Sequence, residues 1–197
     1  MKIVRAIEHV GQQGYSGVGY VPLLCADTAR VNRGEAVYLA HPEHAYSLTP
    51  CLYARLRGVC KSVDGGQAEC YVEALGLALH LCDETLRDAL RRDGLPWTSA
   101  VSFDRAIVAG EPELRLADLP PGPESFALRV GAEERRGGGE PLAGRLLSTI
   151  SGFSRVLSFN TGDWLLLPLM PPAGLVSLPA RVQLTLGGHL LLDEHIR

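Results

Sequence analysis

The stretch between residues 75 and 104 constrains the fold of this chain more than any other part of the sequence. It begins with an apolar run, residues 75–81, of the kind that forms a buried strand. Asp83 then stands where a helix N-cap is expected, and residues 84–92 have the pattern of a short amphipathic helix. Gly94 and a proline two residues later are typical of a helix end. The sequence therefore predicts a strand that leads directly into a capped helix.

The spacing within this stretch resembles the fumarylacetoacetate hydrolase family. Members of that family read G-x-A-L-D-L-T-x-R-D, then a helix, then G-x-P-W-x-x-A-K-x-F-D. The positions that fit this pattern without a gap are Gly76, Ala78, Leu79, Leu81, Gly94, Pro96, Trp97, Ala100, Phe103 and Asp104. The resemblance extends over residues 35–192. It implies an α+β fold that is mainly β: the rolled mixed β-sheet of the family's C-terminal domain type, with a few helices.

The remainder of the chain shows mostly short strands. We predict a short N-terminal β segment, residues 1–34, followed by a fumarylacetoacetate hydrolase-like domain, residues 35–197. Helices are predicted at residues 68–74, 84–92 and 142–157. Strands are predicted at residues 1–7, 36–40, 52–56, 75–81, 126–130, 164–167, 181–186 and 189–192. A further strand is expected after the glycine-rich segment that follows residue 7. The last two strands are expected to pair across Gly187-Gly188, which is a hairpin turn signal.

Composition excludes several classes of protein. The hydrophobic fraction of 46% with 21% charged residues predicts a globular chain and not a disordered one. A net charge of -3 gives no basic footprint for nucleic acid or an anionic membrane. No segment reads as a signal peptide or a membrane span, so a cytoplasmic location is expected. The 5 cysteines lack C-x-x-C pairing, which argues against a disulfide framework and a structural zinc site.

The family resemblance implies a metal site whose ligands are missing here. Family members bind Mg²⁺ or Mn²⁺ through an E-x-E pair on one strand and an Asp on another. Alignment back from Gly58 places the pair on Pro50 and Leu52, and the Asp position holds His80. A hard cation requires carboxylate oxygens, so we expect no magnesium or manganese ion there, and no other cofactor.

The resemblance also locates substrate-binding positions. The family's substrate-binding Lys is replaced by Val101, and its T-G-T-P-x-G loop is replaced by the apolar sequence from Leu167 to Pro172. The predicted substrate-binding residues are therefore Cys51, Val101, Ser102, Leu167, Leu169 and Met170. Such a lining would favour a larger or less charged ligand than a small dicarboxylate.

Three residues are candidates for catalysis: His80, Cys82 and Tyr53. His80 has the chemistry of a general base near neutral pH, but a buried histidine bonded to backbone is an equally good interpretation. Cys82 would be a nucleophile if His80 lowered its pKa, although core packing explains it more simply.

A separate cluster of metal-ligating residue types lies at His41, Glu43 and His44. Together with His80 these side chains would suit a softer metal such as zinc. A solvated loop explains the same residues, and the sequence leaves the choice open.

Two classes of function remain. The first is a metal-independent isomerase, cyclase, lyase or hydrolase that acts on an enolisable 2-oxo or β-dicarbonyl small molecule, with His80 as acid or base. The second is a catalytically inactive homologue that binds a ligand or serves as a partner subunit. The expected partner is a small-molecule substrate or ligand, not nucleic acid or membrane. The resemblance implies a homodimer, or a heteromer with an active homologue.

Overall fold

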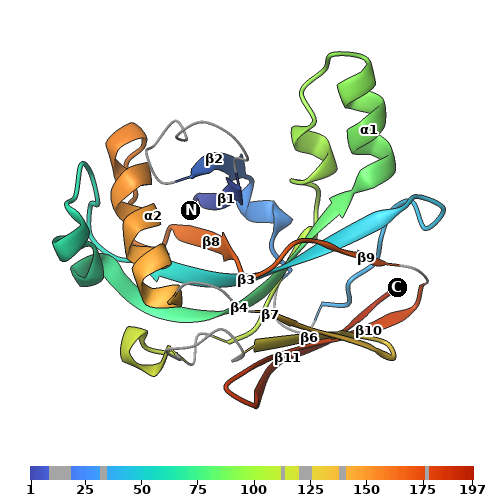
Figure 1. Cartoon of the computed structure of the whole chain (residues 1–197). Coiled ribbons are helices and arrows are strands. Elements are labelled where there is room, and N and C mark those ends of the chain that lie inside the picture. The colour runs from blue at the N-terminus through green and yellow to red at the C-terminus, as the bar shows by residue number, and fades with distance from the viewer. Residues whose placement is uncertain (9–18, 32–34, 112–113, 120–125, 138–140, 176–177) are drawn as a thin grey trace.

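Two β-sheets form the framework of the molecule (Figure 1). The computed structural model describes residues 1–8, 19–31, 35–111, 114–119, 126–137, 141–175 and 178–197. The larger sheet has the order β2 (Tyr20–Cys25), β1 (Ile3–Glu8), β8 (Trp164–Pro168), β3 (Tyr46–Leu56), β4 (Val72–Asp83) and β5 (Ile107–Ala109), and β9 (Ala173–Leu175) also pairs with β3. The smaller sheet has the order β11 (His189–Ile196), β10 (Ala180–Leu186), β6 (Phe126–Val130) and β7 (Glu133–Gly137).

The N-terminal strands are part of the larger sheet. Strand β1 pairs antiparallel with β2 on one side and parallel with β8 on the other. Strand β8 in turn pairs antiparallel with β3. The N-terminal β segment predicted at residues 1–34 therefore pairs with strands that come after residue 35.

The long antiparallel pair β3–β4 has an apolar layer on each of its two faces. Because side chains alternate along a strand, each strand of this pair contributes to both faces of the sheet. Leu52 of β3 and Leu79 of β4 belong to the larger apolar cluster, which helix α2 (Leu142–Val156) covers with Leu146, Ile150 and Phe153. A smaller apolar cluster lies on the opposite face and includes Ile3, Cys51, Tyr53, Ala78, Ile107, Trp164 and Leu166.

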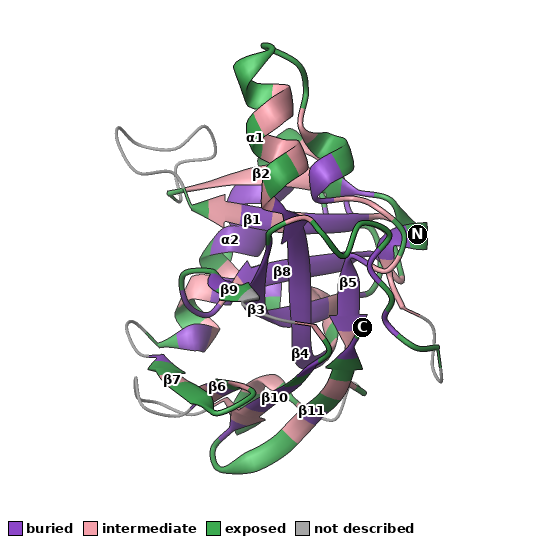
Figure 2. Cartoon of the chain, turned by 90° about the vertical axis from the view of Figure 1, so that its right-hand side faces the viewer, coloured by how far each residue is buried: buried purple, intermediate pink, exposed green. Residues whose placement is uncertain are grey.

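Helix α1 (Glu84–Arg92) differs from α2 because it projects from the end of β4. It has no fully buried residue, and Figure 2 shows it in the colours of partial and full exposure above the buried strands. The Asp83 side chain caps this helix by accepting a hydrogen bond from the Leu86 backbone N–H at 2.9 Å. None of the helices in the described ranges combines the length and apolar character needed to cross a bilayer.

Most predicted elements are confirmed, including both longer helices, the Asp83 cap and the 187–188 hairpin turn. Both turn glycines have positive φ, 58° and 82°, which few other residues adopt. The strand predicted at residues 36–40 is wrong, since only Val37 makes a single bridge, to Ile196. Residues 65–71 form a 3₁₀ helix instead of a helix over 68–74. Strand β3 begins six residues earlier than predicted, and β5, β7 and β9 were missed.

Candidate functional site

The position of the family's metal-binding Asp is occupied by a buried histidine that contacts an arginine. Arg5 on β1 reaches across the sheet to β3 and β4. Its Nη1 lies 2.5 Å from His80 Nδ1, and its Nη2 donates to Thr49 Oγ1 at 2.8 Å. On its other side, His80 Nε2 lies 2.6 Å from the Val101 backbone oxygen. Both ring nitrogens of His80 therefore have partners.

These contacts fix the protonation state of His80. A guanidinium only donates hydrogen bonds and a carbonyl only accepts them, so Nδ1 accepts from Arg5 and Nε2–H donates to Val101. Burial and the adjacent Arg5 charge lower the pKa of His80 to about 3. The imidazole is neutral near pH 7 and has no accessible lone pair. This arrangement favours the interpretation of a structural histidine over that of a general base.

The register of β3 and β4 places Pro50 and Leu52, the positions to which the resemblance assigned the E-x-E pair, on the opposite face of the sheet from His80. Thr49 is the residue directly opposite His80 in the β3–β4 register. Thr49 and Cys51 therefore share the His80 face, whereas Pro50 and Leu52 point to the other side. Neither the threonine hydroxyl nor the thiol supplies the carboxylate oxygen that a hard cation prefers.

The cysteines of this face are poor nucleophiles. Burial raises the pKa of Cys51 to about 12. The pKa of Cys82 is also raised to about 12, by burial and then by the Glu84 charge, despite the nearby Arg87 and Arg5 charges. A thiol in that state reacts slowly because the thiolate is the nucleophile. All 5 cysteines are unpaired thiols, and Cys70 alone is exposed.

The predicted substrate-binding residues do not come together. Leu167, Leu169 and Met170 lie in the larger apolar cluster, on the other side of the sheet from Cys51. Val101 is buried, and its backbone oxygen is occupied by His80. Ser102 Oγ accepts a hydrogen bond from the Ala26 backbone N–H at 2.8 Å. The expected apolar pocket is therefore not formed by these residues, which pack instead as core and loop.

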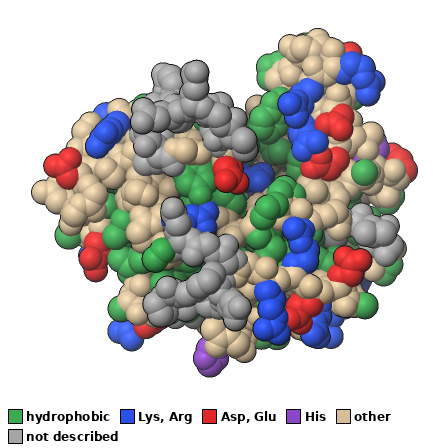
Figure 3. All heavy atoms as spheres, viewed as in Figure 1, with side chains coloured by type: hydrophobic (Ala, Val, Ile, Leu, Met, Phe, Trp, Pro, Cys, Tyr) green, Lys and Arg blue, Asp and Glu red, His purple; other side chains and the backbone are tan. Residues whose placement is uncertain are grey.

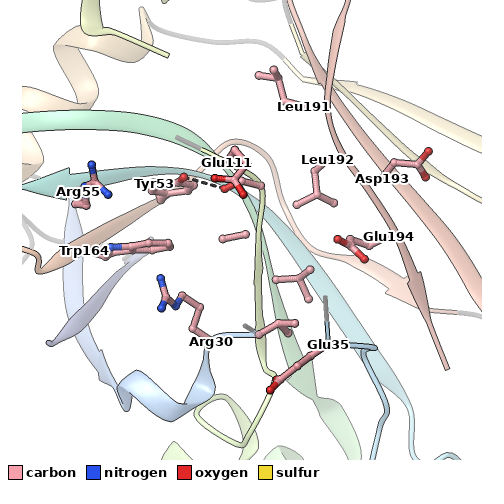
Figure 4. A pocket seen from close by; sticks show the side chains of 14 residues that line it. Arg30, Glu35, Tyr53, Arg55, Glu111, Trp164, Leu191, Leu192, Asp193 and Glu194 are labelled. Atoms are coloured by element: carbon pink, nitrogen blue, oxygen red, sulfur yellow. Dashed lines mark hydrogen bonds between the residues drawn. The ribbon is translucent and has the colours of Figure 1, made fainter. Parts of the chain in front are cut away.

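Of the predicted site residues, Tyr53 is the one that lines a large pocket in the described part of the chain. The pocket has a volume of about 560 Å³ and lies between the β3–β5 face and strand β11 (Figure 4). The Tyr53 ring stacks on Trp164 with centroids 4.3 Å apart, and its hydroxyl donates to the Gly110 oxygen at 2.8 Å. Gly76 permits this, because a Cβ there would lie 2.6 Å from the ring.

The walls of this pocket are charged. The Arg30 guanidinium lies over the Trp164 ring, 5.1 Å from its centroid. Arg55, Glu35, Glu111, Asp193 and Glu194 also line the pocket (Figure 4). Burial, followed by the Asp193 charge, raises the pKa of Glu194. A charged lining is the opposite of the apolar lining that the sequence predicted.

Sequence reasoning missed the residues that surround Tyr53. Trp164 was read as the start of a strand, and Arg30 lies in a short segment without a motif. The missing signal is long-range: β8 pairs with β3, which places Trp164 opposite Arg55 and next to Tyr53. No local pattern indicates this pairing.

The comparison with solved structures agrees with this architecture, whereas no family model and no curated protein matches the chain. Among solved structures, a fumarylacetoacetate hydrolase family protein from Yersinia pestis superposes with a TM-score of 0.77 at 19% identity, covering 100% of this chain and 92% of that one. The chain has the fumarylacetoacetate hydrolase fold.

Two enzymes of this fold are similar to the chain to the same degree. Fumarylpyruvate hydrolase from Pseudomonas aeruginosa, solved with Mn²⁺ and pyruvate, gives a TM-score of 0.75 at 20% identity and covers 100% of this chain and 87% of its own. The 5-carboxymethyl-2-hydroxymuconate delta-isomerase from Mycobacterium smegmatis gives 0.74 at 20% identity, covering 99% and 78%. The fold predicted from the central motif is confirmed.

Proposed function

We propose that this chain binds a small organic acid in the Tyr53–Trp164 pocket, without a divalent cation at the position where the family resemblance implies one. The observation that carries the proposal is Arg30. Its guanidinium makes no ion pair with any residue the structure describes, and its buried Nε has no hydrogen-bond partner there. Held over Trp164 at the pocket wall, this charge is suited to a carboxylate.

The other charges of the pocket support one orientation of the ligand. Arg55 is paired with Glu73 at 3.0 Å, and Asp193 is held by Arg181, so both are partly neutralised. Glu194 stands across the pocket, and its carboxylate offers an acceptor to a hydroxyl or amino group of a ligand. A ligand with its carboxylate at Arg30 and a hydrogen-bond donor at Glu194 would satisfy both ends.

The surface charges argue for a small ligand over a polyanion. On the face seen in Figure 3, Lys and Arg side chains are interspersed with Asp and Glu. Such a mixture lacks the single-sign patch on which nucleic-acid binding depends. The net charge of -3 points the same way.

The replacement of the metal site supports a loss of metal-assisted chemistry. Arg5 places a permanent positive charge against Thr49 and His80, where the resemblance implies a cation bound by carboxylates. A second positive charge at that place would be repelled by Arg5 and would find no carboxylate ligand.

A second candidate is metal-independent proton transfer on an enolisable acid in the same pocket. Glu194 favours it, because a carboxyl group with a raised pKa beside a bound acid has the properties of a general base. Tyr53, a catalytic candidate from the sequence, would then form part of the pocket wall through its stacking on Trp164. In this version His80 keeps its structural role.

The test is calorimetric titration of the purified chain with pyruvate, succinate and acetylpyruvate, each with and without EDTA. We expect acetylpyruvate or another of these acids to bind with EDTA present. Arg30→Met should weaken that binding at least about 10-fold, because it removes a charge-assisted bond. Arg115→Met is the matched control, since the Arg115 side chain is 88% exposed and lies outside the pocket.

Binding by none of the three acids, or equal affinity in the Arg30→Met protein, would overturn the proposal. Turnover of acetylpyruvate that EDTA abolishes would do the same. Turnover that EDTA leaves intact and that Glu194→Gln lowers would establish the second candidate.

A further inference from the structure

A tight turn ahead of β3 brings two histidines together. The backbone N–H of His44 donates to the carbonyl oxygen of His41 at 3.0 Å, which closes a four-residue turn. Pro42 at the second position suits such a turn because its ring fixes φ. The two imidazoles lie on the same side of the turn and stack, with centroids 4.7 Å apart and planes at 20°.

The glutamate of the same turn completes a set of three ligand atoms. Glu43 Oε1 lies 3.4 Å from His41 Nδ1 and 3.9 Å from His44 Nε2. One ligand atom from each residue falls within 4.8 Å of the other two. Ligands of a tetrahedral zinc ion are roughly 3.4 Å apart at metal–ligand bonds of about 2.0–2.1 Å. Small side-chain rotations at this exposed turn would bring the atoms to that spacing.

An independent feature orients one of the histidines. His44 Nδ1 lies 2.7 Å from Asp83 Oδ2, and the Asp83 side chain is only 4% exposed. The carboxylate accepts a hydrogen bond from Nδ1–H, so Nε2 of His44 carries the lone pair, faces Glu43 and is available as a ligand atom. A carboxylate behind the histidine is the arrangement that holds metal-ligating histidines in position elsewhere.

The position of Asp83 is itself fixed by the fold. Its Oδ1 accepts the Leu86 N–H at the start of α1, while Oδ2 is directed to His44. The turn is further tied to the helix by a hydrogen bond from the Ala45 N–H to Thr85 Oγ1 at 3.0 Å. The end of β4 and the start of α1 thus hold the turn and the supporting carboxylate as one unit.

We propose that His41, Glu43 and His44 bind a zinc ion, with Asp83 supporting His44 and water completing the coordination. Two imidazoles and one carboxylate suit zinc and other borderline metals, whereas magnesium and calcium require oxygen ligands. His80 is not part of this site, because both of its ring nitrogens are bonded to Arg5 and Val101. The site lies outside the Tyr53–Trp164 pocket and does not depend on the proposed function.

The first experiment measures Zn²⁺ binding by the full chain, after dialysis against EDTA and then into metal-free buffer, using calorimetry. We expect one equivalent for the parent protein, and loss of that equivalent in His41→Ala and in His44→Ala. His189→Ala is the matched control, since this histidine is exposed in the β10–β11 hairpin, and it should keep the parent stoichiometry. Titration of the parent protein with Mg²⁺ at the same concentration should give no binding heat that is lost in His41→Ala or His44→Ala.

The second experiment substitutes the supporting carboxylate with Asp83→Asn. An asparagine can still cap α1 through its oxygen, but its amide nitrogen donates to His44 Nδ1 and so moves the imidazole proton to Nε2. Zinc affinity should fall about 10–100-fold, as for other supporting residues. Circular dichroism and thermal unfolding without metal would show that α1 remains folded.

The proposal would be overturned by no zinc equivalent in the parent protein, an unchanged equivalent in both turn variants, its loss in His189→Ala, or unchanged affinity in a folded Asp83→Asn protein. A cobalt-substituted sample provides a further readout, because its visible spectrum reports the ligand geometry directly. An octahedral, water-dominated spectrum unaffected by His44→Ala would also contradict the assignment.

Discussion

His80 and His44 are two histidines in different environments, and the contrast between them shows what determines the role of a histidine. Both rings have one nitrogen bonded to a charged neighbour. For His80 that neighbour is the Arg5 donor, and a carbonyl takes the second nitrogen. For His44 it is the Asp83 acceptor, and the second nitrogen faces Glu43 at 3.9 Å. A hydrogen-bond donor beside the ring binds the lone pair of the unprotonated nitrogen, as Arg5 does for His80. An acceptor binds the N–H instead, as Asp83 does for His44, so the other nitrogen keeps a lone pair that is free to bind a metal.

The difference also explains why substitution at the family's metal position leads to a structural site. The sequence places a histidine where the resemblance expects an aspartate, and a histidine can bind metals. Arg5, which comes from β1 and is remote in sequence, decides the outcome by occupying Nδ1. The chemistry of the position is therefore determined by a tertiary contact and not by the residue type alone.

Removal of Arg5 should produce the largest effect on this contrast. Arg5→Met keeps much of the side-chain volume but leaves the buried His80 Nδ1 and Thr49 Oγ1 without their donor. We expect a loss of about 2–4 kcal/mol in the free energy of unfolding, measured with urea. Arg115→Met, at an exposed site, should change it by less than about 0.5 kcal/mol. Equal stability of the two variants would show that the Arg5 contacts contribute little.

Acid should lower the free energy of unfolding through the buried His80. The folded-state pKa of His80 is about 3, below its ordinary value of 6.5, so the unfolded chain binds a proton that the folded chain does not. The stabilisation is complete above pH 6.5 and decreases as the pH falls towards 3, by about 1.4 kcal/mol per pH unit within that window. The difference in slope between the parent and His80→Gln, from urea titrations at pH 7 to 4, isolates this contribution. Parallel slopes would contradict it.

Thr49→Val should have a smaller effect, because it removes one acceptor while nearly preserving shape. Arg5 would lose the bond of 2.8 Å to Thr49 but keep its contact with His80. We expect a loss of about 1 kcal/mol in the free energy of unfolding. A double variant with Arg5→Met should be less destabilised than the sum of the two single variants, because both act on one network. Strict additivity would mean that the two residues are not coupled.

The smallest effect is expected at the exposed turn. His41→Ala in metal-free buffer should change the free energy of unfolding by less than about 0.5 kcal/mol, because the side chain is 56% exposed. Urea denaturation in the presence of EDTA measures it. If His41→Ala lowered the free energy of unfolding as much as Arg5→Met does, the exposed His41 would contribute as much to stability as the buried Arg5–His80 contact, and the contrast would fail.

Local patterns in the sequence were sufficient for the elements around the central motif. The apolar run before Asp83, the cap itself and the amphipathic residues of α1 were predicted because each depends on neighbours within a few positions. The same holds for α2 and for the turn at Gly187 and Gly188. Short strands such as β5 and β9, with three residues each, carry too little periodicity to be recognised.

The candidate site was less predictable because it is assembled from distant segments. The sequence did not show that Pro50 and Leu52 point away from His80, since strand side chains alternate and a shift of one residue reverses the face. Tyr53 was identified, but its neighbours Arg30 and Trp164 come from other parts of the chain. The turn at His41 and His44 was recognised as a cluster, whereas the carboxylate that orients it is nearly forty residues further on.

The insertion of β1 between β2 and β8 has a consequence for the order of events during synthesis. Strand β1 has its parallel partner at residues 164–166, and the Lys2 backbone N–H bonds to Asp163 Oδ1 across 161 positions. Before β8 has been synthesised, the chain can form the β1–β2 and β3–β4 pairs but lacks the strand that joins them. Closing such a long loop is slow, so we expect the larger sheet to be completed only late, after β8 has left the ribosome. Until then the unpaired edges of β1 and β3 are the segments most exposed to aggregation.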